Sequence, residues 1–302
     1  MKALFIGQSY IDVTMDADVI PQGDDKAVAR DYAISFGGNA VTAAFACAKL
    51  GQVPDLLASV ADDWLGHMFI DMAQQYRIPL HARKVIRSSL SFILPKDGKR
   101  AILRARDDDY LHPYPNLNIA GCQALHVDGH QHEAALHYAE TCRKRGILTS
   151  LDGGSLRPST YELTGYIDVA IVAERLCQQM NFGTMQMLDF LKSRGCKIGG
   201  VTEGERGMLW YDESGKVQRL PALPVEQNFV IDTSGAGDVF HGAYVASYLA
   251  RPDDPWVEHF LYARAASAWK IQHMGNEAGL PTSENIAQMR ARYETPENMP
   301  QE

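Results

Sequence analysis

Four residues in the last third of the chain have the types and the order expected of a site that handles a phosphate group. Gly235, Ala236 and Gly237 precede Asp238 and an apolar run of helical length, in the stretch DTSGAGDVFHGAYVASYLA. If a loop becomes a helix here, small residues leave backbone N–H groups free to face an anion, and the helix dipole adds about half a positive charge. Asp238 could then accept a proton from a hydroxyl group that attacks the phosphate. The alternative is that Asp238 only caps a helix.

Apolar runs and amphipathic segments alternate through most of the chain, and they would position this site. Strand-like runs lie near 2–7, 124–129, 147–154, 168–174 and 198–204, and helical patterns lie near 40–51, 63–76, 132–146 and 183–195. This alternation predicts a mainly parallel sheet with helices on both faces. Such sheets bind ligands at the carboxyl ends of their strands.

Two segments interrupt this alternation, at 15–35 and at 88–106. The second reads SSLSFILPKDGKRAILRAR, two alternating runs about an Asp-Gly pair, which is typical of a β-hairpin. We interpret both segments as strands of a small second sheet that projects from the main domain.

Composition excludes several classes of protein. The chain has 302 residues, 46% of them hydrophobic, and a formal net charge of -8, which argues against binding to nucleic acid or to a membrane surface. No apolar run reaches the length of a membrane span. Five scattered cysteines without a CxxC pair indicate a reducing compartment, so we expect a cytoplasmic protein. We interpret His126, His130 and His132 as a strand and loop rather than a metal cluster.

Four motifs, in order, resemble those of the phosphofructokinase B (PfkB) family of ribokinase-like carbohydrate kinases. They are IGQSYID, which ends at Asp12, FGGNAVTAAFACAKLG at 36–51, VTEGERG at 201–207 and DTSGAGDVFHGA at 232–243. The resemblance covers about residues 2–282. It implies a three-layer αβα domain spanning 1–302 with a mainly parallel sheet, and a small β-sheet lid formed by about 13–35 and 88–110.

The resemblance also implies an ATP-dependent sugar kinase and a role for each matched residue. Asp238 would be the general base, and the amides of Gly235, Ala236 and Gly237 would form an anion hole for the phosphoryl group. The remaining positions would line the sugar pocket (Asp12, Gly37, Gly38, Thr42), border the nucleotide (Thr202, Gly204, Gly207, Glu174, Gly275), or hold a monovalent cation such as K⁺ (Asp232, Ser234, Gly279, beside Gly275). Mg²⁺ would accompany ATP.

Two departures from the family pattern leave alternatives open. Thr42 stands where many members have Asn, and the N-x-x-E motif associated with magnesium is replaced by Glu174 and Cys177. A sensor of sugars or nucleotides that has lost turnover is therefore a second hypothesis, although the complete GAGD sequence favours an enzyme. A dinucleotide dehydrogenase is a third, but no strand is followed by G-x-G-x-x-G.

The sugar itself is not identified by the motifs. The chain is similar to the branch that contains 6-deoxy-6-sulfofructose kinase, and a simple ketose or a phosphosugar is also open. If the lid segments are strands, Lys26 and Arg30 share one face, and Arg104 and Arg106 share another. These cations would bind an acidic group on the sugar, or they face solvent or the acidic run 107–109. The exposed edges and apolar face of a small sheet need cover, so we also expect a homodimer through the lid.

Overall fold

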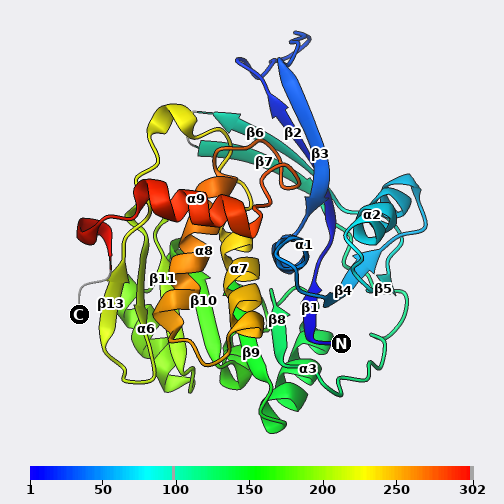
Figure 1. The fold of residues 1–302 in the computed structure, drawn as a ribbon. Coiled ribbons are helices and arrows are strands. Elements are labelled where there is room, and N and C mark those ends of the chain that lie inside the picture. Colours follow the sequence, from blue (N-terminus) through cyan, green and yellow to red (C-terminus); the bar gives the residue numbers. More distant parts are fainter. Residues whose placement is uncertain (97–98, 300–302) are drawn as a thin grey trace.

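The computed structural model describes residues 1–96 and 99–299 and contains one large sheet and one small sheet (Figure 1). The large sheet has nine strands in the order β13-β12-β11-β10-β9-β8-β1-β4-β5. Their bounds are β1 Ala3–Gly7, β4 Pro54–Val60, β5 Leu80–Lys84, β8 Ala124–Val127, β9 Leu148–Gly153, β10 Val169–Ala173, β11 Ile198–Thr202, β12 Met208–Tyr211 and β13 Val217–Leu220. At one edge, β12 pairs antiparallel with both β11 and β13, and all other pairs in this sheet are parallel. The prediction of a mainly parallel sheet is therefore confirmed.

Helices cover both faces of this sheet. One layer consists of α1 (Asn39–Lys49), α2 (Trp64–Gln75), α7 (Ala236–Ala250), α8 (Trp256–Lys270) and α9 (Ser283–Tyr293). The opposite layer consists of α3 (His132–Lys144), α4 (Thr160–Leu163), α5 (Glu174–Gln179) and α6 (Thr184–Ser193). Each layer packs its own hydrophobic cluster against the sheet. The three-layer αβα architecture is therefore as the resemblance implied.

The strand order reverses beside β1, and this reversal locates the ligand side of the sheet. From β1 the chain first adds β4 and β5 on one side and then returns to add β8 on the other. A crevice for ligands forms at such a switch point, outside the carboxyl ends of the strands. Gly7 and Asp152 lie at or near the ends of β1 and β9, on this edge.

The small sheet is the lid, and its strands have the order β3-β2-β6-β7. They are β2 (Tyr10–Asp16), β3 (Asp31–Gly37), β6 (Leu90–Lys96) and β7 (Lys99–Ala105). The hairpin predicted within 88–106 is confirmed by the antiparallel pairing of β6 and β7, whereas its Asp-Gly turn at 97–98 lies outside the described residues. The lid projects from one side of the main domain (Figure 1).

The register of the lid strands gives the sheet two different faces. One row of paired residues is polar: Ser35, Asp12, Ser91 and Arg104. The next row is apolar: Ile34, Val13, Phe92 and Leu103. The polar row faces the start of α7, since Arg100, on the same face of β7 as Arg104, contacts Thr233. We call these the inner and outer faces of the lid.

The first lid segment differs from the sequence prediction. Residues 17–30 contain no strand, so Lys26 and Arg30 do not share a sheet face. Pro21, and Gly23 with a φ of +58°, interrupt the extended backbone there. Arg30 pairs with Asp16 at 2.7 Å and with Asp18 at 3.1 Å. Lys26 is exposed on the loop that joins β2 to β3.

Two further observations bear on the sequence analysis. All five cysteines lie within the described residues, where they are buried and form no disulfide. Among residues 1–96 and 99–299, no helix is long and apolar enough to cross a membrane.

Candidate active site

The start of α7 has the loop-to-helix geometry that the GAGD sequence predicted. Gly235 is the N-cap residue, with φ +74° and ψ −2°, a left-handed conformation that favours glycine. Ala236 and Gly237 begin the helix, and Asp238 follows within the first turn. A Cβ atom added to Gly237 would meet nothing within 4 Å. Space is therefore open beside Gly237, whereas Gly235 packs against Asn276 and the Ala236 amide lies 3.5 Å from the Thr233 carbonyl oxygen.

Asp238 is half-buried beside this turn, and its surroundings favour the protonated form. Burial, and then the charge of Asp152, raise the pKa of Asp238 to about 7, while Arg100 and Arg104 of the lid oppose the shift. A carboxylate whose pKa lies near neutrality is better suited to exchange protons than an ordinary surface acid. The structure thus gives Asp238 an environment that a helix-capping role would not require.

Asp12 and the glycine pair before α1 form the second part of the site. Gly38 is the N-cap of α1 with a φ of +102°, and a Cβ there would collide with the Gln8 carbonyl oxygen. A Cβ on Gly37 would collide with the Asp12 carboxylate. Glycine at position 37 thus lets the backbone lie against Asp12, and glycine at position 38 lets it lie against the Gln8 carbonyl oxygen.

Asp12 is almost fully buried, yet one of its carboxylate oxygens has no partner. Its Oδ2 accepts a hydrogen bond from Nδ2 of Asn276 at 3.1 Å, whereas Oδ1 has no hydrogen-bond partner among the described residues. Burial raises the pKa of Asp12 to about 6. An unpaired buried acceptor of this kind is costly unless a ligand donates to it. Asn276 was not identified from the sequence.

Asp152 brings a third buried acid to the same region, and sequence analysis missed it. Its Oδ2 accepts from Nδ2 of Asn39 at 3.2 Å and lies 3.7 Å from Nε2 of His241. Burial is the main cause that raises the pKa of Asp152 to about 7. The signal was present, because Asp152 lies near the end of β9, on the ligand edge of a parallel sheet.

Behind Asp152, a chain of buried hydrogen bonds connects α7 to β9 and β8. Tyr244 bonds His241 at 2.9 Å and Ser150 at 2.6 Å, and Ser150 bonds His126 at 2.9 Å. His126, Asp152 and His241 each offer one atom that could bind a metal ion, and these atoms lie within 4.8 Å of one another. His130 pairs instead with Asp128 at 3.3 Å. His126 and His130 therefore have different partners.

Arginines of the lid face this group of acids. Arg100 donates to the Thr233 carbonyl oxygen at 3.0 Å, which brings β7 against the loop before α7. The guanidinium of Arg104 lies 5.0 Å from the centre of the Tyr10 ring. Burial lowers the pKa of Arg157, which is half-buried after β9; the charge of Asp128 opposes this shift, whereas those of Arg106 and Arg104 add to it. Sequence analysis identified neither Arg100 nor Arg157.

The predicted cations differ in their partners. Arg106 pairs with Asp108 at 3.0 Å, as one of the two interpretations expected. Within residues 1–96 and 99–299, neither Arg104 nor Arg157 forms an ion pair. Lys26 lies on the β2–β3 loop and makes no described contact with Asp12 or Asp238.

The predicted sugar-side residue Thr42 is fully buried in α1, and its Oγ1 has no hydrogen-bond partner among the described residues. Asn39, one turn earlier, provides an amide group nearer to the acids through its bond to Asp152.

The predicted nucleotide-side residues lie at the turn between β11 and β12. Thr202 ends β11, and Gly204 and Gly207 bracket a short 3₁₀ turn. Gly207 packs so closely on the residues after β13 that a Cβ would collide with the Leu220 carbonyl oxygen. This turn and the start of α5, where Glu174 lies, are adjacent because Arg206 pairs with Glu174 at 2.8 Å.

The residues in place of N-x-x-E fit a magnesium ion only in part. Cys177 is buried, and burial raises the pKa of its thiol to about 11, so the thiol stays neutral and is a poor ligand for a hard cation. Glu174 offers a half-exposed carboxylate and remains the residue of this pair that can contribute.

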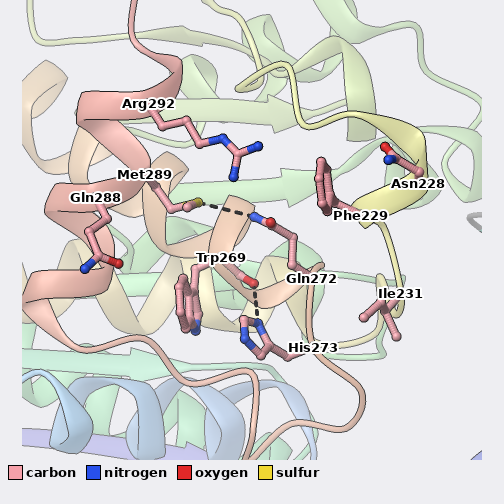
Figure 2. A pocket seen from close by; sticks show the side chains of 9 residues that line it. All are labelled: Asn228, Phe229, Ile231, Trp269, Gln272, His273, Gln288, Met289 and Arg292. Atoms are coloured by element: carbon pink, nitrogen blue, oxygen red, sulfur yellow. Dashed lines mark hydrogen bonds between the residues drawn. The ribbon is translucent and has the colours of Figure 1, made fainter.

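A separate hollow of about 490 Å³ lies beside the loop that precedes α7 (Figure 2). Its lining comes from residues 228–231, the end of α8 and α9, and includes Phe229, Trp269 and Arg292. Within it, Gln272 donates to the Met289 sulfur at 3.3 Å, and His273 bonds the Trp269 carbonyl oxygen at 2.9 Å. None of the residues predicted from the sequence lines this hollow.

The fold, the glycine turns and the acid at the start of α7 together define a ribokinase-like α/β kinase. The family model for the "pfkB family carbohydrate kinase" matches residues 2–283. The chain belongs to that family and is a carbohydrate kinase. Members bind ATP, and one solved relative is a ribokinase from Cryptococcus neoformans in complex with ADP.

Similar proteins agree over nearly the whole chain. A ribokinase from Lactococcus lactis is 22% identical, with 93% of this chain and 94% of that protein covered. An ATP-dependent ribose-1-phosphate kinase from Halopiger xanaduensis is 25% identical, with 95% and 97% covered. A solved structure from Agrobacterium tumefaciens, assigned as a ribokinase, is 25% identical, with a TM-score of 0.86 and 96% and 98% covered. These identities support the family without identifying the sugar.

Proposed function

We propose that the chain transfers the γ-phosphoryl group of ATP to a hydroxyl group of a sugar, with Asp238 as the general base. The observation that carries this proposal is the position of Asp238 on the first turn of α7, next to Gly237, beside which the space is open. The raised pKa of Asp238 supports it, because the group can take a proton near neutral pH.

Each part of the site has a task in this reaction. Asp12 accepts hydrogen bonds from sugar hydroxyls through its unpaired oxygen. Asp238 takes the proton of the attacking hydroxyl. The N–H groups of Gly235, Ala236 and Gly237 and the helix dipole stabilise negative charge on the transferring group. Arg100 is placed at the same loop, where its guanidinium can neutralise phosphate charge.

The nucleotide is expected at the turn of Thr202, Gly204 and Gly207. Glu174 would contribute to holding Mg²⁺ there, since its carboxylate borders the same turn through Arg206. Bound magnesium would neutralise charge on the phosphates of ATP. The Gly275 amide donates to Asp232, so the loop after α8 lies against the loop before α7 and would border the nucleotide on that side.

We further propose that the sugar carries an acidic group. Arg104 and Arg157 lie near Tyr10 and form no ion pair among the described residues, although the charge of Asp128 acts on Arg157. Arg106 pairs with Asp108. Guanidinium groups bind phosphate, sulfonate and carboxylate by paired hydrogen bonds. One relative is a kinase of ribose 1-phosphate, which is itself an acidic sugar. The sulfofructose kinase branch fits the same chemistry.

The lid is proposed to join two copies of the chain. On its outer face, Ile34, Phe92 and Leu103 are 41%, 42% and 74% exposed although they form one apolar row. An apolar sheet face of this kind is unfavourable in water and is suited to cover by an identical sheet.

A nucleotide-consumption assay with a panel of neutral, phosphorylated, sulfonated and carboxylated sugars tests the proposal. We expect the conversion of ATP to ADP to depend on one class of acidic sugar, with one phosphorylated sugar formed for each ADP. Stabilisation of the protein by ATP and a sugar, without any turnover, would favour the sensor hypothesis instead.

A further inference from the structure

A lysine side chain is fully buried between the loop before α7 and the loop after α8. Lys270 is the last residue of α8, and neither its side chain nor that of Asp232 is exposed. Its ammonium group donates to Oδ2 of Asp232 at 3.2 Å, to the Asp232 carbonyl oxygen at 3.1 Å and to the His273 carbonyl oxygen at 3.3 Å. An ammonium group has three N–H donors, so these oxygens satisfy all of them.

The residues around this ammonium group are those at which a monovalent cation was expected. Oδ1 of Asp232 accepts from the Ser234 amide at 2.8 Å, and Oδ2 also accepts from the Gly275 amide at 3.0 Å. Gly279 lies against the lysine stem, because a Cβ there would collide with Lys270 Cδ. The two loops that would surround an ion therefore surround Lys270.

This arrangement does not fit an additional cation. Carbonyl and carboxylate oxygens are the groups that would bind the ion, and the ammonium group already takes three of them. A second positive charge at contact distance from the ammonium group would be repelled in a buried site. The carboxylate of Asp232 at 3.2 Å favours the charged form of Lys270, in opposition to burial, which lowers its pKa.

We propose that the ammonium group of Lys270 takes the place of a monovalent cation, so that the protein needs no potassium ion. The contact between Lys270 and Asp232 matters for the anion hole, because Asp232 is only three residues before Gly235. By tying Asp232 to the end of α8, Lys270 fixes the loop from which α7 begins. Lys270 is thus a positioning residue. The effect on turnover rests on the proposed kinase function, whereas the effect on stability does not.

The first experiment uses the unmodified chain. Its melting temperature and kcat/KM are measured with Tris salts of ATP at one ionic strength, in KCl, NaCl or tetramethylammonium chloride. We expect both quantities to be the same in all three salts, within about twofold for kcat/KM. A tenfold or larger activation by KCl would overturn the proposal. No phosphorylation in any salt would contradict the proposed function, while the melting temperatures would still test the cation.

The second experiment separates a missing charge from a missing volume. Lys270→Ala removes the charge and leaves space for an ion, whereas Lys270→Met removes the charge and fills the space. We expect KCl or NH₄Cl, relative to tetramethylammonium chloride, to raise the melting temperature and activity of Lys270→Ala but not of Lys270→Met. Lys197→Ala, at an exposed lysine that pairs with the buried Asp168, is the control and should not respond.

An equal salt response in all three variants would overturn the proposal, because it would show a general effect of ionic strength. If neither Lys270 variant folds, the salt comparison on the unmodified chain decides alone.

Discussion

The floor of the site and the lid above it differ in the charge and burial of their functional groups. The floor consists of Asp152 and Asp238 on the main domain and of Asp12 near the start of lid strand β2, and these acids are buried or half-buried. The inner face of β7 instead carries Arg100 and Arg104, which are exposed. Burial raises the pKa of the floor acids, whereas the lid arginines retain access to solvent and to a ligand.

This difference suggests a division of tasks. A group whose pKa is set by burial needs rigid surroundings. The floor acids lie on strands or at a helix start, and Asp12 and Asp152 accept hydrogen bonds from Asn276 and Asn39. Cations on an exposed strand can approach a ligand after it binds. We therefore expect changes in the floor to affect all sugars equally, and changes in the lid to affect only sugars that carry the acidic group.

Asp238→Asn should have the largest effect. The amide keeps the shape of the side chain but cannot take a proton at neutral pH, so we expect kcat to fall about 10²- to 10⁴-fold on every sugar that is turned over. Melting temperature and ATP binding should be unchanged. Asp189→Asn, an exposed acid on α6, is the matched control. A loss of less than about tenfold in kcat would refute the role of Asp238 as base.

Arg104→Ala should have the next largest effect, and it should depend on the sugar. A hydrogen bond to a charged group contributes about 1.5–3 kcal/mol, so we expect kcat/KM to fall roughly 10- to 150-fold on the acidic sugar and little on its neutral analogue. Lys26→Ala is the control, because the structure places Lys26 on the β2–β3 loop. Equal losses on both sugars would remove the distinction between lid and floor.

The pH dependence of kcat/KM should show the floor acid directly. Asp238 must be deprotonated to act as a base, and its pKa is raised to about 7, so activity should rise with pH through 7. Between pH 7 and pH 6 we expect roughly a fivefold loss of kcat/KM from this single group.

The effect of pH on the stability of the fold has the opposite sign. Because folding raises these carboxyl pKa values, the stability they contribute is present at low pH and is lost as pH rises toward 7. An activity profile that is flat from pH 5.5 to 8 would contradict the assignment.

Local sequence predicted the floor better than the lid, and the reason is physical. The turn at Gly235–Asp238 is determined by neighbours in the chain, because small residues and an acid before an apolar run favour one helix start. Arg100 contacts Thr233 from β7, and Arg157 lies near Tyr10 and Arg104 on the loop after β9, so only the tertiary fold shows these positions. Lys26 was misplaced because alternation in DKAVAR outweighed the breaks at Pro21 and Gly23.

Lys270 shows the same limit from the other side. At the end of an apolar helix, its sequence position is typical of a lysine that favours a helix C-terminus. Nothing local indicates that its side chain turns inward to Asp232, which is 38 residues earlier in the chain. The cation expected from the family pattern was therefore predicted without the residue that occupies its place.

The outer face of the lid gives the smallest expected effect on turnover, although it changes the assembly. Leu103 is 74% exposed beside Phe92, and burying such a side chain contributes about 1.5–3 kcal/mol. We expect the unmodified chain to be a dimer and Leu103→Asp to be a monomer in light scattering at micromolar concentration. Because Leu103 points away from the acids, kcat/KM per chain should change less than about twofold. Val53→Asp, at an exposed apolar residue outside the lid, should leave the dimer intact. A monomeric unmodified chain would contradict the lid interface, and a monomeric Leu103→Asp variant with lost turnover would show that the lid's outer face also supports the site.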